Sequence, residues 1–399
     1  MIIEKIEVFR LPTANSRQNS PIGCRIYTDT GLAGDGEAGI AYGIGGSAAF
    51  GMVCDLAELV VGMDPMRTEL IWETMYKRIF WGQNGGPIIF AGIAAIDIAL
   101  WDIKGKFFGV PIYQLLGGKV RDKLRAYASQ LQFGWGQVGV SEHLWAVTPE
   151  DYAYNVRLAV AEGYDAIKID FFDRDEEGRK LNFLETTGIL TPRQLHMVET
   201  RMKAAREAAG DDVDIIMENH SYPDARGAVQ LAKLAEKYNI MAFEEPNTPS
   251  VQTVEYITKY TSVPIANGER LYSRWQYAEH LKNNLLQLAQ PDLCNCGGYT
   301  EVKKIADLCH IYDCGIQVHC AGSPLTTSAA LQIECALPNF QIHEHHTCNR
   351  MDTSVGLTKV NLQPENGYFT VPELPGHGNE FLRSAIDNAS LHKVVELKK

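Results

Sequence analysis

Acidic and imidazole side chains recur at the ends of apolar segments in the second half of the chain, about one helix and one strand apart. Counted over the strand-end residues from Glu218 to Glu344, the successive gaps are 26, 25, 23, 27 and 25 residues. A strand followed by a helix, repeated at this spacing, is typical of a parallel barrel whose active site forms at the carboxyl ends of the strands. Because a buried strand has no structural need for a terminal carboxylate, the pattern predicts a catalytic centre. Its members are Glu218, His220, Glu244, Glu269, Asp292, His319 and Glu344.

Three of these carboxylates, Glu218, Glu244 and Glu269, end consecutive predicted strands. At short range they would repel one another strongly unless a cation lay among them. An all-oxygen ligand set favours a hard ion, Mg²⁺ before Mn²⁺ or Ca²⁺. The alternative is three separate salt bridges to Lys or Arg side chains. Glu245 faces away from Glu244 on a strand, so we expect it to hold a Lys or Arg instead.

Asp292 and His319 end the next two predicted strands, which are neighbours in a barrel. A carboxylate beside an imidazole fixes its tautomer and supports the charge that the ring gains with a proton. The pair therefore predicts a general base, with a purely structural histidine as the alternative. His220 stands two residues after Glu218, which predicts that both side chains emerge on one strand face.

The elements that position these residues follow from the hydrophobic pattern. Alternating polar and apolar residues predict strands at 2–11 and 22–30, and the Gly and Asp of a tight turn stand in 28–38. Loops that are candidate lids are predicted at 12–22 and 36–47. Apolar residues at helical spacing predict helices across 48–116, so the start of the chain is an α+β domain. Asp97 and Asp102 in that region are predicted structural contacts.

The remainder predicts an α/β barrel of eight strands beginning at residue 125, with Thr148 as the N-cap of its first helix. Residues 173–187 form a charged insertion after the second strand. We place the first domain at 1–124, the barrel at 125–344, and at 345–399 a C-terminal segment that returns to the first domain. Barrel helices are predicted at 149–163, 192–209, 223–238, 250–260, 273–283, 299–313 and 325–337.

Composition limits the classes of partner. The net charge is −12 and the pI is near 5.4, which argues against nucleic acid and anionic membrane as partners. The start of the chain lacks a secretory leader pattern, and no window approaches 18 uninterrupted apolar residues. Nine cysteines without a paired framework suit a reducing compartment, so we expect a cytoplasmic protein. Cys294 and Cys296 are interpreted as packing residues, with metal binding as the alternative.

The ordered set resembles the enolase superfamily, in its mandelate racemase subgroup. The matching residues are Lys168, Glu218, Glu244 within FEEP, Glu269 within GER, Asp292 within QPD, His319 and Glu344, and the segment GIAAIDIALWDIKGKFFGVPIYQLLGG matches as well. The resemblance covers nearly the whole chain and implies a (β/α)7β TIM-like barrel with an N-terminal α+β capping domain. It also implies that residues 15–47 supply specificity loops, that the three glutamates bind Mg²⁺, and that a proton next to a carboxylate is removed to give a metal-stabilised enediolate.

The chain further resembles the acid-sugar dehydratases of the galactonate and mannonate type. These have an acidic residue, a spacer and His where this chain has Glu218 to His220, and IANGERLYSRWQY is similar to their strand-five segment. The resemblance implies that His319, with Asp292, removes the C2 proton of an aldonate while His220 protonates the departing 3-hydroxyl, giving a 2-keto-3-deoxy acid. Glu344 would then hydrogen-bond the substrate carboxylate, with a structural contact to a Lys or Arg as its alternative.

Two departures from the family pattern narrow the reaction. Glu218 stands where the family usually has Asp, and strand two carries Lys168 and Asp170 in place of Lys-x-Lys. The missing second Lys disfavours racemization and favours dehydration or cycloisomerization by one base. Lys168 is expected near the substrate carboxylate, with an ordinary salt bridge as its alternative. An epimerase, a lactone cycloisomerase and a catalytically silent sugar-acid-binding homologue remain open.

The small-molecule acid sugar itself is read by loops. We expect additional substrate contacts from Asp170, Trp81, Arg270 and Trp145. Trp145 lies in the 132–147 stretch, which also contains Trp135 and His143. Because relatives are often symmetric multimers, the resemblance also implies a homo-oligomer.

Overall fold

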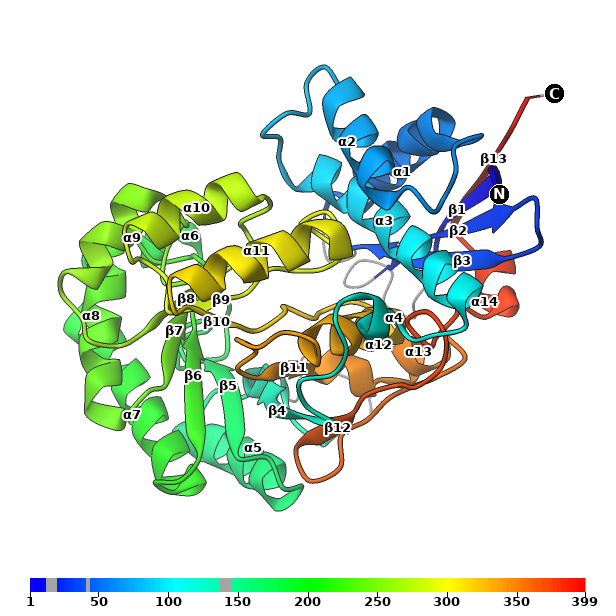
Figure 1. The fold of residues 1–399 in the computed structure, drawn as a ribbon. Helices are drawn as coiled ribbons and strands as arrows, with labels where there is room; N and C mark the ends of the chain where they lie inside the picture. The colour runs from blue at the N-terminus through cyan, green and yellow to red at the C-terminus, as the bar shows by residue number, and fades with distance from the viewer. Residues whose placement is uncertain (12–19, 41–43, 137–144, 399) are drawn as a thin grey trace.

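The computed structural model describes residues 1–11, 20–40, 44–136 and 145–398, which form a barrel and a smaller α+β unit packed against it (Figure 1). The barrel has eight parallel strands in the order β10-β9-β8-β7-β6-β5-β4-β11, and a parallel bridge between Ile316 and Phe340 joins its two ends. This is the α/β barrel predicted from the spacing. The strands are β4 (Lys123–Ser129), β5 (Ala166–Asp170), β6 (Asp214–Glu218), β7 (Ala242–Glu244), β8 (Ile265–Asn267), β9 (Leu288–Ala289), β10 (Gly315–Ile316) and β11 (His343–His346).

Helices surround the barrel, and their starts follow local signals in the sequence. Thr148 accepts a hydrogen bond from the Asp151 backbone and caps the first of them, as predicted, and Thr191 caps another in the same way. None of the described helices is long and apolar enough to span a membrane. The barrel helices are α5 (Pro149–Ala161), α6 (Phe183–Thr186), α7 (Pro192–Ala209), α8 (Ala225–Ala235), α9 (Val251–Thr258), α10 (Arg274–Lys282), α11 (Tyr299–Ile311) and α12 (Pro324–Glu334), with 3-10 turns η1 (Leu131–Phe133), η3 (Glu236–Tyr238) and η4 (Thr347–Arg350).

The α+β unit joins the two ends of the chain. Its antiparallel sheet has the order β13-β1-β2-β3, so β13 (Leu391–Glu396) from the C-terminal segment pairs with β1 (Ile3–Arg10). Strands β2 (Ile22–Thr28) and β3 (Ala33–Ala38) complete the sheet, and α1 (Gly46–Val60), α2 (Thr68–Arg78), α3 (Pro87–Phe108) and α4 (Ile112–Leu115) follow. The C-terminal segment also carries α13 (Asp352–Val355), β12 (Tyr368–Thr370), which pairs antiparallel with β4, and α14 (Arg383–Asp387).

Strand β3 corrects the prediction that residues 36–47 form a loop. Residues 36–38 belong to this strand, which contains Gly34 and Gly36. A Cβ on Gly34 would lie 2.2 Å from the Ala99 carbonyl oxygen, and one on Gly36 would lie 1.9 Å from the Ala95 carbonyl oxygen. The strand is glycine-rich because α3 passes directly over it, and a glycine-rich strand is indistinguishable from a turn in one sequence. Residues 46–47 open α1, so the loop prediction is wrong there too, and residues 12–19 and 41–43 of the predicted lids lie outside the described residues.

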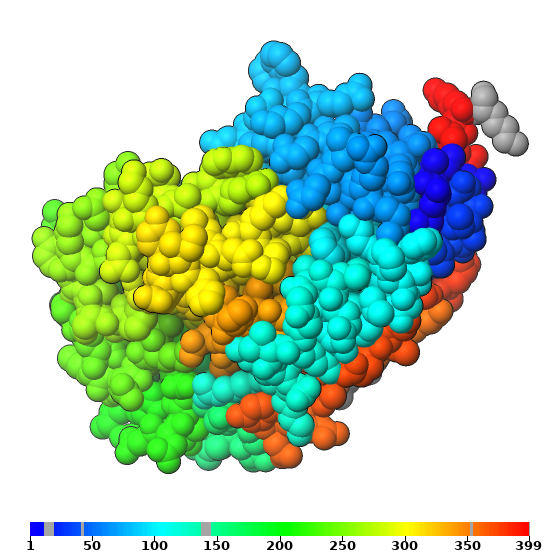
Figure 2. All heavy atoms as spheres, in the orientation of Figure 1, coloured from blue at the N-terminus to red at the C-terminus, as the bar shows by residue number. Residues whose placement is uncertain are grey.

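The two units are tied together by buried polar contacts. The Trp72 indole donates to the Gly297 carbonyl at 2.9 Å, and Asp97 accepts from the Thr300 hydroxyl at 2.6 Å and its backbone N–H at 3.0 Å. Glu37 at the end of β3 accepts from the Ser323 backbone N–H at 3.0 Å. Figure 2 shows the blue and cyan atoms of the α+β unit in contact with the yellow atoms around residue 300. Asp97 is therefore a structural contact, as predicted, and the α+β unit is fixed against the barrel.

Glu7 on β1 links the two ends of the chain and makes the stability of the α+β unit depend on pH. It is buried and accepts hydrogen bonds from Tyr27, Arg383 and His392. Burial alone would raise its pKa, but Arg383, Tyr27 and His392 together lower the pKa of Glu7 to about 2 from the usual 4.5. The ionised form therefore stabilises the fold above pH 4.5, and this contribution is lost as the pH falls from 4.5 toward 2.

We expect Glu7→Gln to lower the free energy of unfolding by about 1–3 kcal/mol at pH 7. Urea unfolding of both proteins at pH 7 and pH 3 should show the difference shrinking at the lower pH. Glu4→Gln, exposed on the same strand, serves as the control and should unfold like the wild type. A difference of equal size at both pH values would contradict the assignment of the shifted group to Glu7.

Candidate active site

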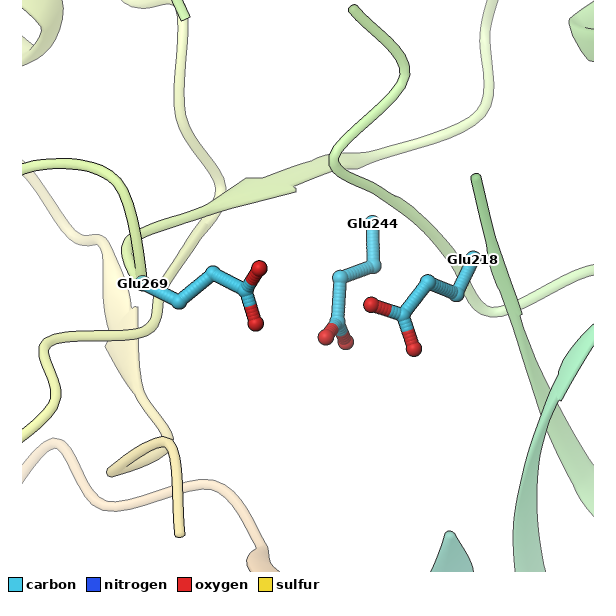
Figure 3. A group of neighbouring side chains, drawn as sticks. All are labelled: Glu218, Glu244 and Glu269. Carbon is cyan, nitrogen blue, oxygen red and sulfur yellow. The ribbon is translucent and has the colours of Figure 1, made fainter. Parts of the chain in front are cut away.

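Three glutamates converge at the carboxyl ends of adjacent barrel strands. Glu218 ends β6 and Glu244 ends β7 in direct register with it, while Glu269 follows β8 by two residues. Each offers a carboxylate oxygen, and these three atoms all lie within 4.8 Å of one another. Figure 3 shows the three carboxylates directed toward a common space. The convergence predicted from the spacing is therefore present in the fold.

Lys168 on β5 lies at the centre of the negative charge. Its fully buried ammonium is 3.2 Å from Glu218 Oε2 and 2.8 Å from Glu344 Oε1, and it also contacts Glu244. Burial alone would lower its pKa, but the three carboxylates hold the pKa of Lys168 well above its ordinary value. In Glu244, burial outweighs the lysine and raises the pKa to about 7. The salt-bridge alternative is thus realised in part, although one lysine is shared among three carboxylates.

The charge balance of the cluster fits a divalent cation. Among the described residues, the four glutamates Glu218, Glu244, Glu269 and Glu344, together with Asp170 and Asp292, face four side chains that can carry positive charge, Lys168, Arg270, His220 and His319. Glu218 Oε1 is buried and has no hydrogen-bond partner among the described residues, although His220 Nε2 lies 3.2 Å from it as a possible ion-pair partner. Oxygen donors with excess negative charge at this separation match the requirements of a hard dication. Glu218, Glu244 and Glu269 are the residues that would hold it.

Arg270 occupies the second layer around this cluster. Its Nη1 contacts Glu269 and lies 3.2 Å from Glu245 Oε2. Glu245 has a φ of 46° and turns away from the glutamate cluster, and it also accepts from the Ser221 hydroxyl. The expectation that Glu245 holds a Lys or Arg is confirmed, whereas Arg270, expected to contact substrate, is engaged by these two carboxylates.

His319 and Asp292 form the predicted pair. Asp292 Oδ2 accepts from His319 Nδ1 at 2.7 Å, and a parallel bridge joins the two residues between their strand ends. Because Nδ1 donates, Nε2 is the atom that can exchange a proton, and it lies 2.9 Å from Glu269 Oε2. Burial would lower the pKa of His319, but Glu344 and Asp292 raise it to about 9.

His220 belongs to a second pair that the sequence did not predict. Its Nδ1 lies 2.9 Å from Asp170 Oδ2, and its Nε2 lies 3.2 Å from Glu218 Oε1. Burial opposes protonation, but Glu218 and Asp170 raise the pKa of His220 to about 9. Asp170, expected to contact substrate, is buried and orients this imidazole instead.

The prediction that strand alternation places His220 on the same strand face as Glu218 is wrong. Strand β6 ends at Glu218, and His220 has a φ of 46° in a turn, so strand alternation does not place it. Its ring reaches the cluster because the chain turns back after Asn219, whose backbone N–H donates to the Glu244 carbonyl at 3.2 Å. The backbone reverses through a non-glycine residue with φ in the left-handed region, and a single sequence does not reveal such a conformation.

Glu344 is held by structural partners on the inner wall. Besides Lys168, the Ser129 hydroxyl donates to it at 2.7 Å and the Cys320 backbone N–H at 2.9 Å. Burial would raise its pKa, but Lys168 and His319 keep the pKa of Glu344 well below the ordinary value. The contact with Lys168 matches the predicted alternative, a carboxylate that holds a lysine.

Two glutamines in the site were missed. Gln130 Nε2 donates to Glu218 Oε2 at 2.6 Å, and Gln290 Nε2 donates to Glu244 Oε2 at 2.5 Å. Gln130 has a φ of 67° just after β4, and Gln290 follows β9. Both stand at strand ends in apolar surroundings, which is the signal that identified the glutamates and would have found them too.

The predicted aromatic contacts with substrate have the following neighbours in the structure. Trp81 is 84% exposed on the α2–α3 connection and packs against Phe80, while Trp145 packs against Phe133 and lies under the Arg174 guanidinium at 3.1 Å. Trp135, in the same stretch, is fully buried against Tyr164. His143 lies outside the described residues. Cys294 and Cys296 are buried and free, which agrees with their interpretation as packing residues.

Comparison with known families accounts for both units. Residues 6–117 match the mandelate racemase/muconate lactonizing enzyme N-terminal domain, and residues 151–385 match the enolase C-terminal domain-like family. Members of this superfamily bind a divalent metal ion, in keeping with the three glutamates.

Individual relatives cover nearly the whole chain. The D-galactonate dehydratase of Ralstonia pickettii (strain 12J) is 34% identical over 361 residues, 89% of this chain and 87% of that protein. The D-galactonate dehydratase of Pectobacterium atrosepticum is 32% identical over 389 residues, 95% of this chain and 92% of that protein.

Solved structures give the same classification. A member of the enolase superfamily from Salmonella Typhimurium is 43% identical, with a TM-score of 0.95, over 99% of this chain and 100% of that chain. The 3,6-anhydro-D-galactonate cycloisomerase from Zobellia galactanivorans is 25% identical, with a TM-score of 0.80, over 98% and 99% of the two chains. The curated dehydratases identify this protein as an enzyme of the hydro-lyase class. The chain belongs to the enolase superfamily, in its mandelate racemase/muconate lactonizing enzyme subgroup.

Proposed function

We propose that this protein is a Mg²⁺-dependent acid-sugar dehydratase that converts an aldonate of the galactonate, mannonate or gluconate type into a 2-keto-3-deoxy acid. The observation that carries the proposal is the pair of imidazoles, each fixed by its own aspartate, on the two sides of the glutamate cluster. Elimination of water needs one group to take a proton and another to give one. Two separately oriented histidines meet that need, and the relatives named D-galactonate dehydratase support it.

The chain's own residues would divide the reaction as follows. His319 Nε2 takes the proton bound to C2, and the electron pair left behind forms the C2–C3 double bond as the C3–O bond breaks. His220 Nε2 gives its proton to the departing 3-hydroxyl, which leaves as water, and the enol product tautomerises to the 2-keto acid. Lys168 supports the substrate carboxylate electrostatically. A divalent cation held by the three glutamates would neutralise the charge developing on that carboxylate and, by offsetting the surrounding field, lower the pKa of His319 toward neutrality.

The direct test is a screen of aldonates and aldarates for 2-keto acid formation with Mg²⁺ present. We expect turnover of at least one aldonate and loss of turnover on chelation. No keto acid from any member of the library would contradict the proposal.

A second candidate is cycloisomerization or epimerization, which the similarity to the Zobellia galactanivorans cycloisomerase favours. Epimerization shares the removal of the C2 proton and needs no acid at C3. Exchange of that proton with solvent deuterium in recovered substrate, without a keto product, would support this candidate over dehydration.

The metal can be tested without a substrate. We expect Mg²⁺ at about 100 times its Kd to stabilise the wild type by about 2.7 kcal/mol and to do little for Glu244→Gln. Thermal unfolding with and without Mg²⁺ measures this. Glu255→Gln, which changes an exposed carboxylate on α9, is the control and should retain the shift. Equal shifts in the wild type and Glu244→Gln would remove Glu244 from the ligand set.

All nine cysteines are free and buried, which supports the proposal of a cytoplasmic enzyme. The proposed partner is the small-molecule substrate.

A further inference from the structure

Strand β11 places one histidine on the inner wall of the barrel that the proposed reaction does not use. Its residues alternate between the two faces. His345 points outward, where its Nδ1 lies 2.5 Å from the Tyr164 hydroxyl, and Glu344 points inward to Lys168. His346, two residues after Glu344, is therefore on the inner face. It is in register with Ser129 of β4, whose hydroxyl also reaches Glu344 from inside the barrel.

A backbone contact fixes the tautomer of His346. The Cys348 N–H donates to His346 Nδ1 at 3.0 Å, and this contact caps η4. Because Nδ1 must offer its lone pair, the neutral ring carries its hydrogen on Nε2. Burial lowers the pKa of His346 to about 4, with Glu344 opposing that shift and Lys168 adding to it. At neutral pH the ring is an uncharged hydrogen-bond donor and is unsuited to act as an acid or base.

The donor has no protein acceptor among the residues that the structure describes. The side chain is only partly buried, and no hydrogen bond from Nε2 is made to any of them. Glu344, on the same face of β11, contacts Lys168 and lies 3.9 Å from His319 Nε2, so this face of the strand lines the space around the proposed base. An N–H group held in a fixed orientation at a binding site can donate a hydrogen bond to an acceptor on the ligand.

We propose that Nε2–H of His346 donates a hydrogen bond to a hydroxyl group of the substrate beyond C3, and that this contact selects sugar acids with an oxygen there. The inference rests on the proposed function. In that reaction the glutamate cluster and Lys168 act on the substrate carboxylate. His319 acts at C2, and His220 acts at C3. His346 stands about 6–7 Å further along the strand than Glu344, toward the barrel mouth. It therefore meets the part of the substrate that extends out of the reacting centre.

Two conservative substitutions separate the donor from the cap. In His346→Asn the amide lies where Nδ1 was, so it can still accept from Cys348 but offers nothing at the Nε2 position. In His346→Gln the amide nitrogen reaches the Nε2 position, while the cap is lost. We expect His346→Asn to keep the thermal midpoint and raise KM for D-galactonate about tenfold with little change in kcat. His346→Gln should show the reverse, a lower midpoint and a nearly normal KM.

D-Glycerate, which ends at C3, provides the second measurement. Its inhibition constant should be the same in the wild type and both variants, because it has no hydroxyl for His346 to bind. A KM that follows the thermal midpoint, a fall in kcat alone, or weaker inhibition by D-glycerate in His346→Asn would overturn the inference.

Calorimetric titration with D-galactonate distinguishes failure of this inference from failure of the proposed function. If the wild type forms no keto acid from any aldonate in the library, the proposed function is refuted. Weaker D-galactonate binding in His346→Asn alone would still support the donor. Equal binding by all three proteins, or no binding by the wild type, would overturn it.

Discussion

His319→Asn should abolish 2-keto acid formation, with kcat lower by on the order of 10³-fold. The Asn amide can occupy the place of Nδ1 and still donate to Asp292, so the local packing is kept. Nothing then stands at the position of Nε2, and the C2 proton has no acceptor. The measurement is single-turnover conversion of the aldonate found in the screen, at saturating Mg²⁺.

Two controls show that the loss is chemical. His310→Asn changes an exposed histidine on α11 and should turn over normally. The Mg²⁺-dependent rise in thermal midpoint should persist in His319→Asn, because the three glutamates are untouched. Turnover within tenfold of the wild type would mean that another residue removes the C2 proton.

His220→Asn should separate proton removal from loss of water. We expect dehydration to fall by about 10²–10³-fold, because no group is left to protonate the 3-hydroxyl. His319 is intact, so deuterium from the solvent should still enter the recovered substrate at C2. Proton NMR of that substrate in D₂O, together with an assay for the keto acid, measures both steps in one sample.

Asp170→Asn tests what the aspartate adds to His220. It keeps an acceptor for Nδ1 but removes the charge that supports the ring, so we expect a smaller loss of dehydration, about 10–100-fold. Asp165→Asn, just before the opposite end of β5, breaks a contact with Arg125 and should leave the rate unchanged. Loss of both exchange and dehydration in His220→Asn would show that this histidine acts before the C2–H bond breaks.

The sequence alone placed the glutamate cluster and the Asp292–His319 pair at one rim of the barrel. Glu218, Glu244, Asp292 and His319 stand at or just beyond the ends of apolar segments, and closing eight parallel strands brings all their carboxyl ends to one rim. Locating the strand ends needs only the period of the βα unit, which can be read from neighbouring residues in the sequence. It required no knowledge of which side chains touch.

Tertiary structure decided the partners and the direction of individual side chains. Asp170 holds His220 because β5 and β6 lie in register and the chain reverses after Glu218, neither of which has a local signal. Strand β3 is glycine-rich because α3 covers it, and His346 Nδ1 accepts from the Cys348 N–H because η4 begins directly after β11. A repeat in sequence fixes where strands end, but contacts between elements far apart in sequence arise only when the elements pack, because packing selects which face, rotamer and turn each residue adopts.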